Sequence, residues 1–344
     1  MYFNPAVGLG MANVISLTDL LADHRLDFLV NFYGSFENSD LSASYTYLKR
    51  RLDLGGGVFH YNNYYNSVFT GVGELLAHNT RFRERNYGVY GRASYPFDTF
   101  RRLDFELQYL NSDRTDYELQ DDAFVLLEGG RTVKNLLQPM LSYVHDTALY
   151  GLHGPVLGSR WILSAARTVN TSTRSIDRFT GIVDFRKYWL PWFRNTVAVH
   201  ASLAVSDGDD PRAFVLGGPW TLRGYSYYDY QTLDNLAGTK MGLVSVEYRL
   251  PLIDYLVFGW PDPWGFSGIG AAVYADFGTA WTSRVKLVGK DDSGRWGLRE
   301  AHGDVGLGLR ANVLFLPMKF DWAWKTDLRK VADMTFQFSI GPEF

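Results

Sequence analysis

The sequence of 344 residues contains no cysteine, which excludes a disulfide framework and any metal or redox site built on thiolates. Lys and Arg number 34 against 37 Asp and Glu, a balance that argues against a nucleic-acid-binding protein. The chain also lacks a long apolar run. Its longest uncharged stretch, residues 54–73, includes three asparagines, a histidine and five glycines. Because a transmembrane helix needs about 18 consecutive apolar residues, we predict none.

Sequence motifs for export and for catalysis are missing as well. The first ten residues, MYFNPAVGLG, have neither the basic nor the apolar region of a signal peptide, so the protein either stays inside the cell or is a mature chain. The seven histidines show no HxxxH or HExxH spacing, and no GxSxG is present. GLGLRA at 306–311 lies inside an alternating segment and opens no helix, so it is no dinucleotide turn. We expect no enzyme, no metal and no cofactor.

Aromatic residues are abundant, with 23 Phe, 22 Tyr and 10 Trp, yet the mean hydropathy is only -0.15. Alternation of apolar and polar residues along the chain explains why the mean hydropathy is low despite the aromatic content. Within residues 100–112, positions 102–109 alternate strictly, with apolar side chains at odd positions and charged or amide side chains at even ones, and residues 240–250 and 302–315 also alternate. Such segments are strands with one apolar face and one polar face.

A soluble sandwich also alternates, but two features favour a different class. The segments run to about 10–14 residues, against about 5–6 for an ordinary strand. Aromatic residues gather at strand ends, as at Tyr188, Trp189 and Trp192. Long alternating strands with aromatic ends are typical of an all-β transmembrane antiparallel β-barrel, in which the polar faces line the lumen.

The predicted strands number sixteen and form one outer-membrane barrel domain over residues 1–344. The weakest is the first, because Pro5 cannot donate to a strand ladder. Long connections at 65–83, 113–130, 206–239 and 282–301 and short turns such as 37–40 and 97–100 fit the two ends of a barrel. The predicted segments are 2–9, 11–20, 24–36, 40–50, 52–64, 84–97, 100–112, 131–146, 158–170, 175–189, 194–205, 240–250, 267–281, 302–315, 318–325 and 333–344.

The connection at 206–239 is the strongest candidate for a functional segment, because long loops without secondary structure usually carry function. Its paired glycines permit unusual backbone geometry, and its arginine stands between apolar neighbours. A surface loop with a solvated arginine is the simpler alternative. The sharper hypothesis is a loop folded into the lumen. The residues singled out are Gly217, Gly218, Leu222, Arg223, Gly224 and Tyr225.

An arginine buried in the lumen requires carboxylate partners, because an unpaired buried charge is strongly destabilising. Glu247 and Asp276 fall on the polar parity of the next two predicted strands. A guanidinium fork can satisfy two carboxylates at once, so we expect both to bind Arg223.

GGPWTLRGY at 217–225 resembles the GG-x3-(V/L)-R-G-(F/Y) loop motif of the outer-membrane assembly-factor superfamily, the family of BamA, TamA and the surface-antigen barrels. GLVSVEYRLPL at 242–252 and VYADFGTAW at 273–281 resemble the family's next two strands. The resemblance implies a sixteen-stranded barrel whose sixth extracellular loop tucks inward, with Arg223 bound by Glu247 and Asp276. TFQFSIGPEF at 335–344 resembles the closing strand, whose recognition signal would comprise Phe336, Phe338, Ile340, Gly341 and Phe344.

The resemblance implies insertion or translocation of polypeptides, without covalent chemistry. A weak seam between segments 2–9 and 333–344 would present an edge to which a client strand could pair. Family members usually carry periplasmic domains such as POTRA repeats, so we expect these 344 residues to be either a barrel fragment or a member that works without such domains. A passive channel, a structural barrel and a secretion pore for one partner remain alternatives. Expected partners are outer-membrane lipid and lipopolysaccharide, client outer-membrane or secreted polypeptides, and periplasmic accessory proteins or a missing N-terminal domain, but no nucleic acid.

Overall fold

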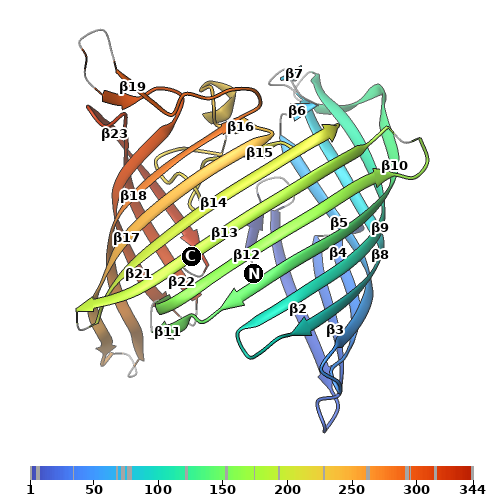
Figure 1. Ribbon diagram of the computed structural model, residues 1–344, viewed down its shortest axis with the longest axis horizontal. Coiled ribbons are helices and arrows are strands. Elements are labelled where there is room, and N and C mark those ends of the chain that lie inside the picture. The colour runs from blue at the N-terminus through green and yellow to red at the C-terminus, as the bar shows by residue number, and fades with distance from the viewer. Residues whose placement is uncertain are drawn as a thin grey trace. The chain divides into compact units, whose positions relative to one another are not determined.

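The chain is built of β-strands from one end to the other, as a computed structural model shows (Figure 1). One 3-10 turn, η1 (Asp229–Gln231), is the sole helical element among the residues described, and these include no helix long and apolar enough to span a membrane. The structure describes all residues except 1, 5–7, 34, 67–68, 71–73, 76–79, 121–122, 152–153, 174, 193, 228, 261–263, 291–293, 295, 314–315 and 342–344.

Fifteen of the strands have ten or more residues, and seventeen strands belong to one sheet. The long strands are β2 (Gly8–Thr18), β3 (His24–Tyr33), β4 (Ser35–Tyr47), β5 (Asp53–Asn66), β8 (Thr80–Pro96), β9 (Arg101–Gln120), β10 (Ala123–Asp146), β12 (Gly154–Asn170), β13 (Asp177–Trp192), β14 (Asn195–Asp209), β17 (Lys240–Phe258), β18 (Trp264–Trp281), β21 (His302–Val313), β22 (Leu316–Thr326) and β23 (Val331–Ile340). The short strands are β1 (Tyr2–Asn4), β6 (Phe69–Thr70), β7 (Glu74–Leu75), β11 (Leu149–Gly151), β15 (Phe214–Val215), β16 (Ala237–Gly238), β19 (Val288–Lys290) and β20 (Trp296–Leu298).

The chain divides into two compact units. Unit 1 comprises residues 1–143, 164–180 and 207–212, and unit 2 comprises residues 144–163, 181–206 and 213–344. In unit 1, each of β2, β3, β4, β5, β8 and β9 pairs antiparallel with the next. In unit 2, β14, β17, β18, β21, β22 and β23 do the same. This order is a meander, in which neighbours in sequence are neighbours in the sheet.

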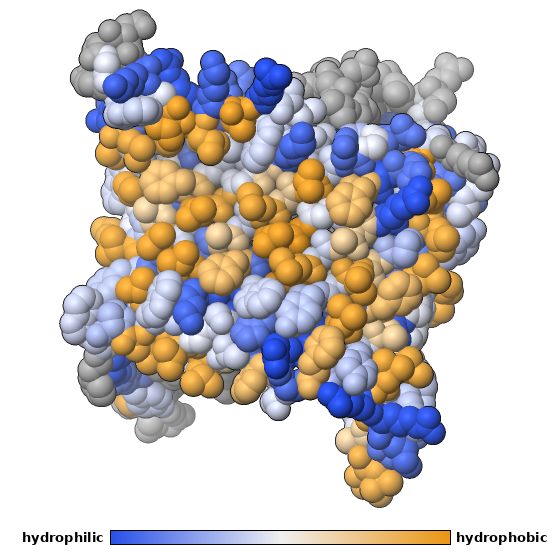
Figure 2. All heavy atoms as spheres, in the orientation of Figure 1, coloured by the Kyte–Doolittle hydropathy of each residue, from blue (hydrophilic) through white to orange (hydrophobic). Residues whose placement is uncertain are grey.

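The burial of side chains is the reverse of that in a water-soluble protein. On β17, Glu247 and Arg249 are buried while Val244 and Val246 are exposed. On β23, Phe336, Phe338 and Ile340 are each about half exposed. Figure 2 shows apolar side chains gathered on the outer surface of the strands. Charged residues inside and aliphatic residues outside are expected of strands that face lipid.

Each predicted segment from 11–20 onward overlaps a long strand, although 24–36 runs past β3 into β4, and the segment 113–130 is not a loop. β9 extends to Gln120 and β10 begins at Ala123. The extension is held by ion pairs, for example Asp113, which binds Arg85 at 2.9 Å and Arg131 at 3.0 Å. Because its stabilising side chains are charged on both strands, the extension lacks the apolar alternation from which we predicted strands.

Two smaller predictions were also wrong. The segment 2–9 is not one strand, since β1 ends at Asn4 and Gly8 already belongs to β2. The turn placed at 37–40 lies inside β4, because the ladder of β3 and β4 continues to Tyr33 opposite Ser35. By contrast, the aromatic residues Tyr188, Trp189 and Trp192 do lie at the end of β13 as predicted, with Tyr188 buried and the two tryptophans exposed. Neighbours along a strand point to opposite faces, which separates Tyr188 from Trp189.

Candidate functional site

The loop between β14 and β17 is a packed substructure. Its two stems pair as β15 and β16, and Leu216 N donates to Leu236 O at 2.8 Å. Together with β17 and β18, the loop forms a small apolar cluster of Leu216, Leu222, Tyr225, Leu236, Leu243 and Ala280. The loop therefore lies against the sheet of unit 2, on its polar face.

The two glycines at the start of the motif make the turn possible. Gly217 has φ 131° and Gly218 has φ 86°, conformations that L side chains rarely adopt. Gly218 N donates to Tyr225 O at 2.7 Å, which closes the turn around the motif. A Cβ on Gly218 would also collide with the ring of Tyr227.

Arg223 lies at the centre of the site and is 4% exposed. Its Nε and Nη2 donate to the two carboxylate oxygens of Asp276, each at 2.7 Å, and its Nη1 donates to Glu247. The guanidinium carbon also lies 3.4 Å from the ring centroid of Tyr274, which adds a cation–π contact. Burial by itself would lower the pKa of Arg223, but the charges of Asp276 and Glu247 outweigh burial and raise it well above its ordinary value. Arg223 is therefore a permanent cation in this site.

The carboxylates come from four successive strands. Glu247 (β17), Asp276 (β18), Asp304 (β21) and Asp321 (β22) are all at most 1% exposed. Asp276 and Asp304 are directly opposite each other in the register of β18 and β21. So dense a group of buried acids is stable only with matched cations.

Two further arginines add positive charge, so that three arginines face the four acids. Arg249 Nε donates to Glu247 Oε2 at 2.7 Å, and Arg310 Nη2 lies 2.8 Å from Asp321 Oδ1. We refer to Arg223, Arg249, Arg310, Glu247, Asp276, Asp304 and Asp321 together as the charge cluster. Its contacts join the loop to four strands at one point.

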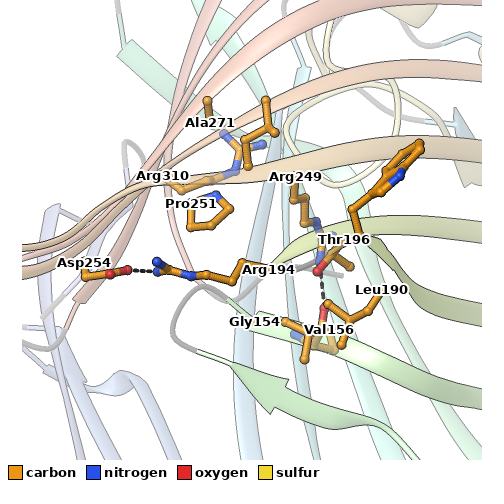
Figure 3. Close-up of a pocket in the computed structure, with 14 residues that line it drawn as sticks. Gly154, Val156, Leu190, Arg194, Thr196, Arg249, Pro251, Asp254, Ala271 and Arg310 are labelled. Carbon is orange, nitrogen blue, oxygen red and sulfur yellow. Dashed lines mark hydrogen bonds and ion pairs between the residues drawn. The ribbon is translucent and has the colours of Figure 1, made fainter.

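A cavity of about 470 Å³ in unit 2 borders the charge cluster (Figure 3). Arg249 and Arg310 line it together with mainly apolar residues, and Arg249 Nη1 donates to Pro155 O at 3.3 Å on its wall. At another side of the cavity, Arg194 binds Asp254. The arginines that hold Glu247 and Asp321 therefore reach from the cluster to this cavity.

Sequence reasoning missed Asp304. Its Oδ2 accepts the backbone N–H of Gly224 at 3.0 Å. A Cβ on Gly224 would lie 2.8 Å from the Cβ of Asp304, so the glycine of the motif allows the backbone to approach this carboxylate. The available signal was its position on the polar parity of the predicted segment 302–315.

Tyr225, the last residue of the motif, contacts residues of β21 and β22. Its hydroxyl donates to Gly303 O at 3.4 Å, its ring stacks edge-on to His302, and Lys325 Nζ lies 4.6 Å from the ring centroid. Burial raises the pKa of Tyr225 to about 12. The phenol is therefore neutral at physiological pH.

Comparison with known proteins decides the family. Residues 9–344 match the Omp85 superfamily domain. The chain belongs to the Omp85 superfamily. No curated protein matches it.

Solved structures agree with this assignment at the level of the fold. BamA from Haemophilus ducreyi lacking POTRA domains 1–3 is 16% identical with a TM-score of 0.67, covering 96% of this chain and 67% of that one. CdiB from Acinetobacter baumannii is 12% identical with a TM-score of 0.55 (98% and 57% covered), and CdiB from Escherichia coli is 13% identical with a TM-score of 0.56 (96% and 58%). The chain thus spans under two thirds of the length of the two CdiB chains. The predicted fold class, an all-β outer-membrane barrel of this superfamily, is confirmed.

In this Omp85 chain, the residues of the predicted closing-strand signal lie apart from the charge cluster. Phe336, Phe338 and Ile340 occupy the exposed face of β23, whereas the loop lies on the polar face. Gly341 follows the strand with φ 150°, and Phe344 lies outside the described residues. The roles of these residues and of the loop motif stay predictions.

Proposed function

We propose that this Omp85 chain inserts or translocates polypeptides at the bacterial outer membrane, through a seam between its first and last strands. The observation that carries the proposal is the loop bound to the polar face by the charge cluster. A steady open pore needs an unobstructed polar interior, and a loop fastened there by buried ion pairs obstructs it. Each carboxylate of the cluster binds an arginine or a backbone N–H, which suits a role in fastening the loop.

The last strand suits a role as one side of the seam. Its exposed residues Phe336, Phe338 and Ile340 would face lipid, so a client strand with the same alternation could pair beside it and enter the bilayer. The strand ends at Ile340, and the next residue still pairs with β22, because Gly341 N–H donates to Pro317 O at 2.9 Å, one step beyond the Met318–Ile340 pair. A last strand of only ten residues offers few backbone hydrogen bonds to a permanent neighbour on its other side.

Client polypeptides, outer-membrane lipid and lipopolysaccharide are the partners of this proposal. Delivery would fall to periplasmic accessory proteins or to an N-terminal domain of the kind that the similar BamA structure lacks in part, its POTRA domains 1–3. The exposed apolar strands support contact with lipid. If the protein moves only one client, that result would favour a secretion pore for one dedicated partner.

The test is to lock the seam with a disulfide between engineered cysteines. Because the sequence has no native cysteine, the engineered pair has no competing thiol. Because Gly8 lies in β2, one cysteine belongs in β1, at Phe3, combined in turn with cysteines at positions 337–340 of β23. The matched control is a disulfide between Ala311 and Met318, which are directly opposite each other in β21 and β22.

We expect the seam disulfide to block client insertion into liposomes and reduction to restore it, while the control disulfide has no effect. Full insertion with a locked seam would refute the proposal.

A further inference from the structure

The loop follows the last two strands along much of their length. At one end, Lys325 Nζ of β22 donates to Asp229 at 2.7 Å. Further along, Thr335 Oγ1 and Gln337 Nε2 of β23 donate to the backbone carbonyls of Gly224 at 3.3 Å and Tyr225 at 3.0 Å. The loop is thus bound to the last strand itself, in addition to the charge cluster on β17 to β22.

Trp220 makes the final contact in this series. Lys319 Nζ of β22 lies 3.5 Å from the centroid of the Trp220 ring. The same ring covers Gly341, where a Cβ would lie 2.7 Å from Cη2 of Trp220. From Lys325 to Lys319 the strand rises by about 20 Å, so these contacts span much of its length.

The absence of a side chain at Gly341 is what admits the tryptophan. Gly341 has φ 150°, and its N–H is bonded to Pro317 O at 2.9 Å, so its backbone is held while the ring lies above it. Trp220 itself is 43% exposed, which means that its position depends on these few contacts and not on a surrounding core.

We propose that Trp220 is a positioning residue that fastens the loop to the end of β23, so that the last strand cannot bend away without moving the loop. The proposal rests on the proposed function, in which β23 is one side of the seam. Thr335 and Gln337 hold the loop backbone at mid-strand, and Trp220 holds it at the strand end. The loop acts as a latch on the strand that a client must reach.

The latch is tested by amide hydrogen exchange in the peptide 331–341, on the full chain in liposomes without client. Trp220→Ala should raise exchange there about fivefold, because the cation–π contact and the cover over Gly341 are both lost. Trp220→Phe keeps a ring on Lys319 and should restore most of the protection. Gln337→Ala, which leaves the tryptophan in place, should raise exchange in the same peptide.

The matched control is Trp296→Ala, since Trp296 is an exposed tryptophan with a lysine, Lys290, at 5.3 Å from its ring in another loop. It should leave exchange in residues 331–341 unchanged. The latch is overturned if Trp220→Ala leaves this peptide protected in a heat-modifiable protein, or if Trp296→Ala loosens it equally. Exchange is measured without client, so a failure of the seam-locking experiment would refute the proposed function and leave this result standing.

Discussion

Replacing Arg223 by alanine removes the buried cation through which the loop binds the carboxylates of the strands. Asp276 would lose both of its 2.7 Å bonds and stay buried, whereas Glu247 would keep Arg249 at 2.7 Å. Breaking a buried ion pair on one side destabilises by about 3–5 kcal/mol, and the lost contact with Tyr274 adds about 1 kcal/mol or more. Since about 1.4 kcal/mol is a factor of ten, the docked loop should become more than roughly 100-fold less favoured.

The assay combines heat-modifiability in gel electrophoresis with protease digestion of the protein in liposomes. Arg223→Ala should make the loop segment 210–239 cleavable under conditions in which the parent chain resists. Arg223→Lys should behave almost as badly, because an ammonium group cannot bind Asp276 and Glu247 with a planar fork. The exposed Arg299→Ala is the matched control and should change nothing.

A double variant separates a stranded carboxylate from lost packing. If the stranded Asp276 causes the defect, Arg223→Ala with Asp276→Ala should be more protease-resistant than Arg223→Ala alone. The reasoning is refuted if Arg223→Ala shows the heat-modifiability and protease resistance of the parent chain.

Four further predictions follow from the same site. Asp304→Asn should keep the loop docked, because the amide oxygen still accepts from Gly224 N–H. Asp304→Leu should destabilise the docked loop by about 1–3 kcal/mol and so make it cleavable by protease, because this hydrogen bond is lost. Gly218→Ala should destabilise by more than about 1 kcal/mol in chemical unfolding, since φ is positive and the added Cβ meets a ring; an unchanged midpoint would contradict this. Because the pKa of Tyr225 is raised to about 12, its contribution to loop docking is complete below about pH 10 and is lost as the pH rises through 12, so Tyr225→Phe should flatten protease sensitivity in that range. Single-channel recording should show small, unsteady conductance that increases when Gly218→Ala loosens the loop, whereas a large steady pore in the parent chain would favour a passive channel.

The strands could be predicted because the property that defines them is local. Residues 302–315 and 240–250 alternate between lipid and polar surroundings whatever their neighbours are, and this alternation needs no register to be recognised. The polar extension of β9 and β10 lacks this alternation, so the sequence did not predict it as strand. Its stability comes from pairs such as Asp113 with Arg85 and Arg131, which are far apart in sequence.

The sequence by itself determined the fold class, the positions of the long strands and the loop motif around Arg223. It also singled out Glu247 and Asp276, because parity along a strand decides which face a side chain takes. Only the tertiary structure decided that Asp304 binds Gly224 and that Trp220 lies over Gly341. Those contacts depend on how far each strand is shifted against the next and on how deeply the loop reaches. Neither quantity is encoded in a local pattern, because one residue of register changes every partner across the sheet.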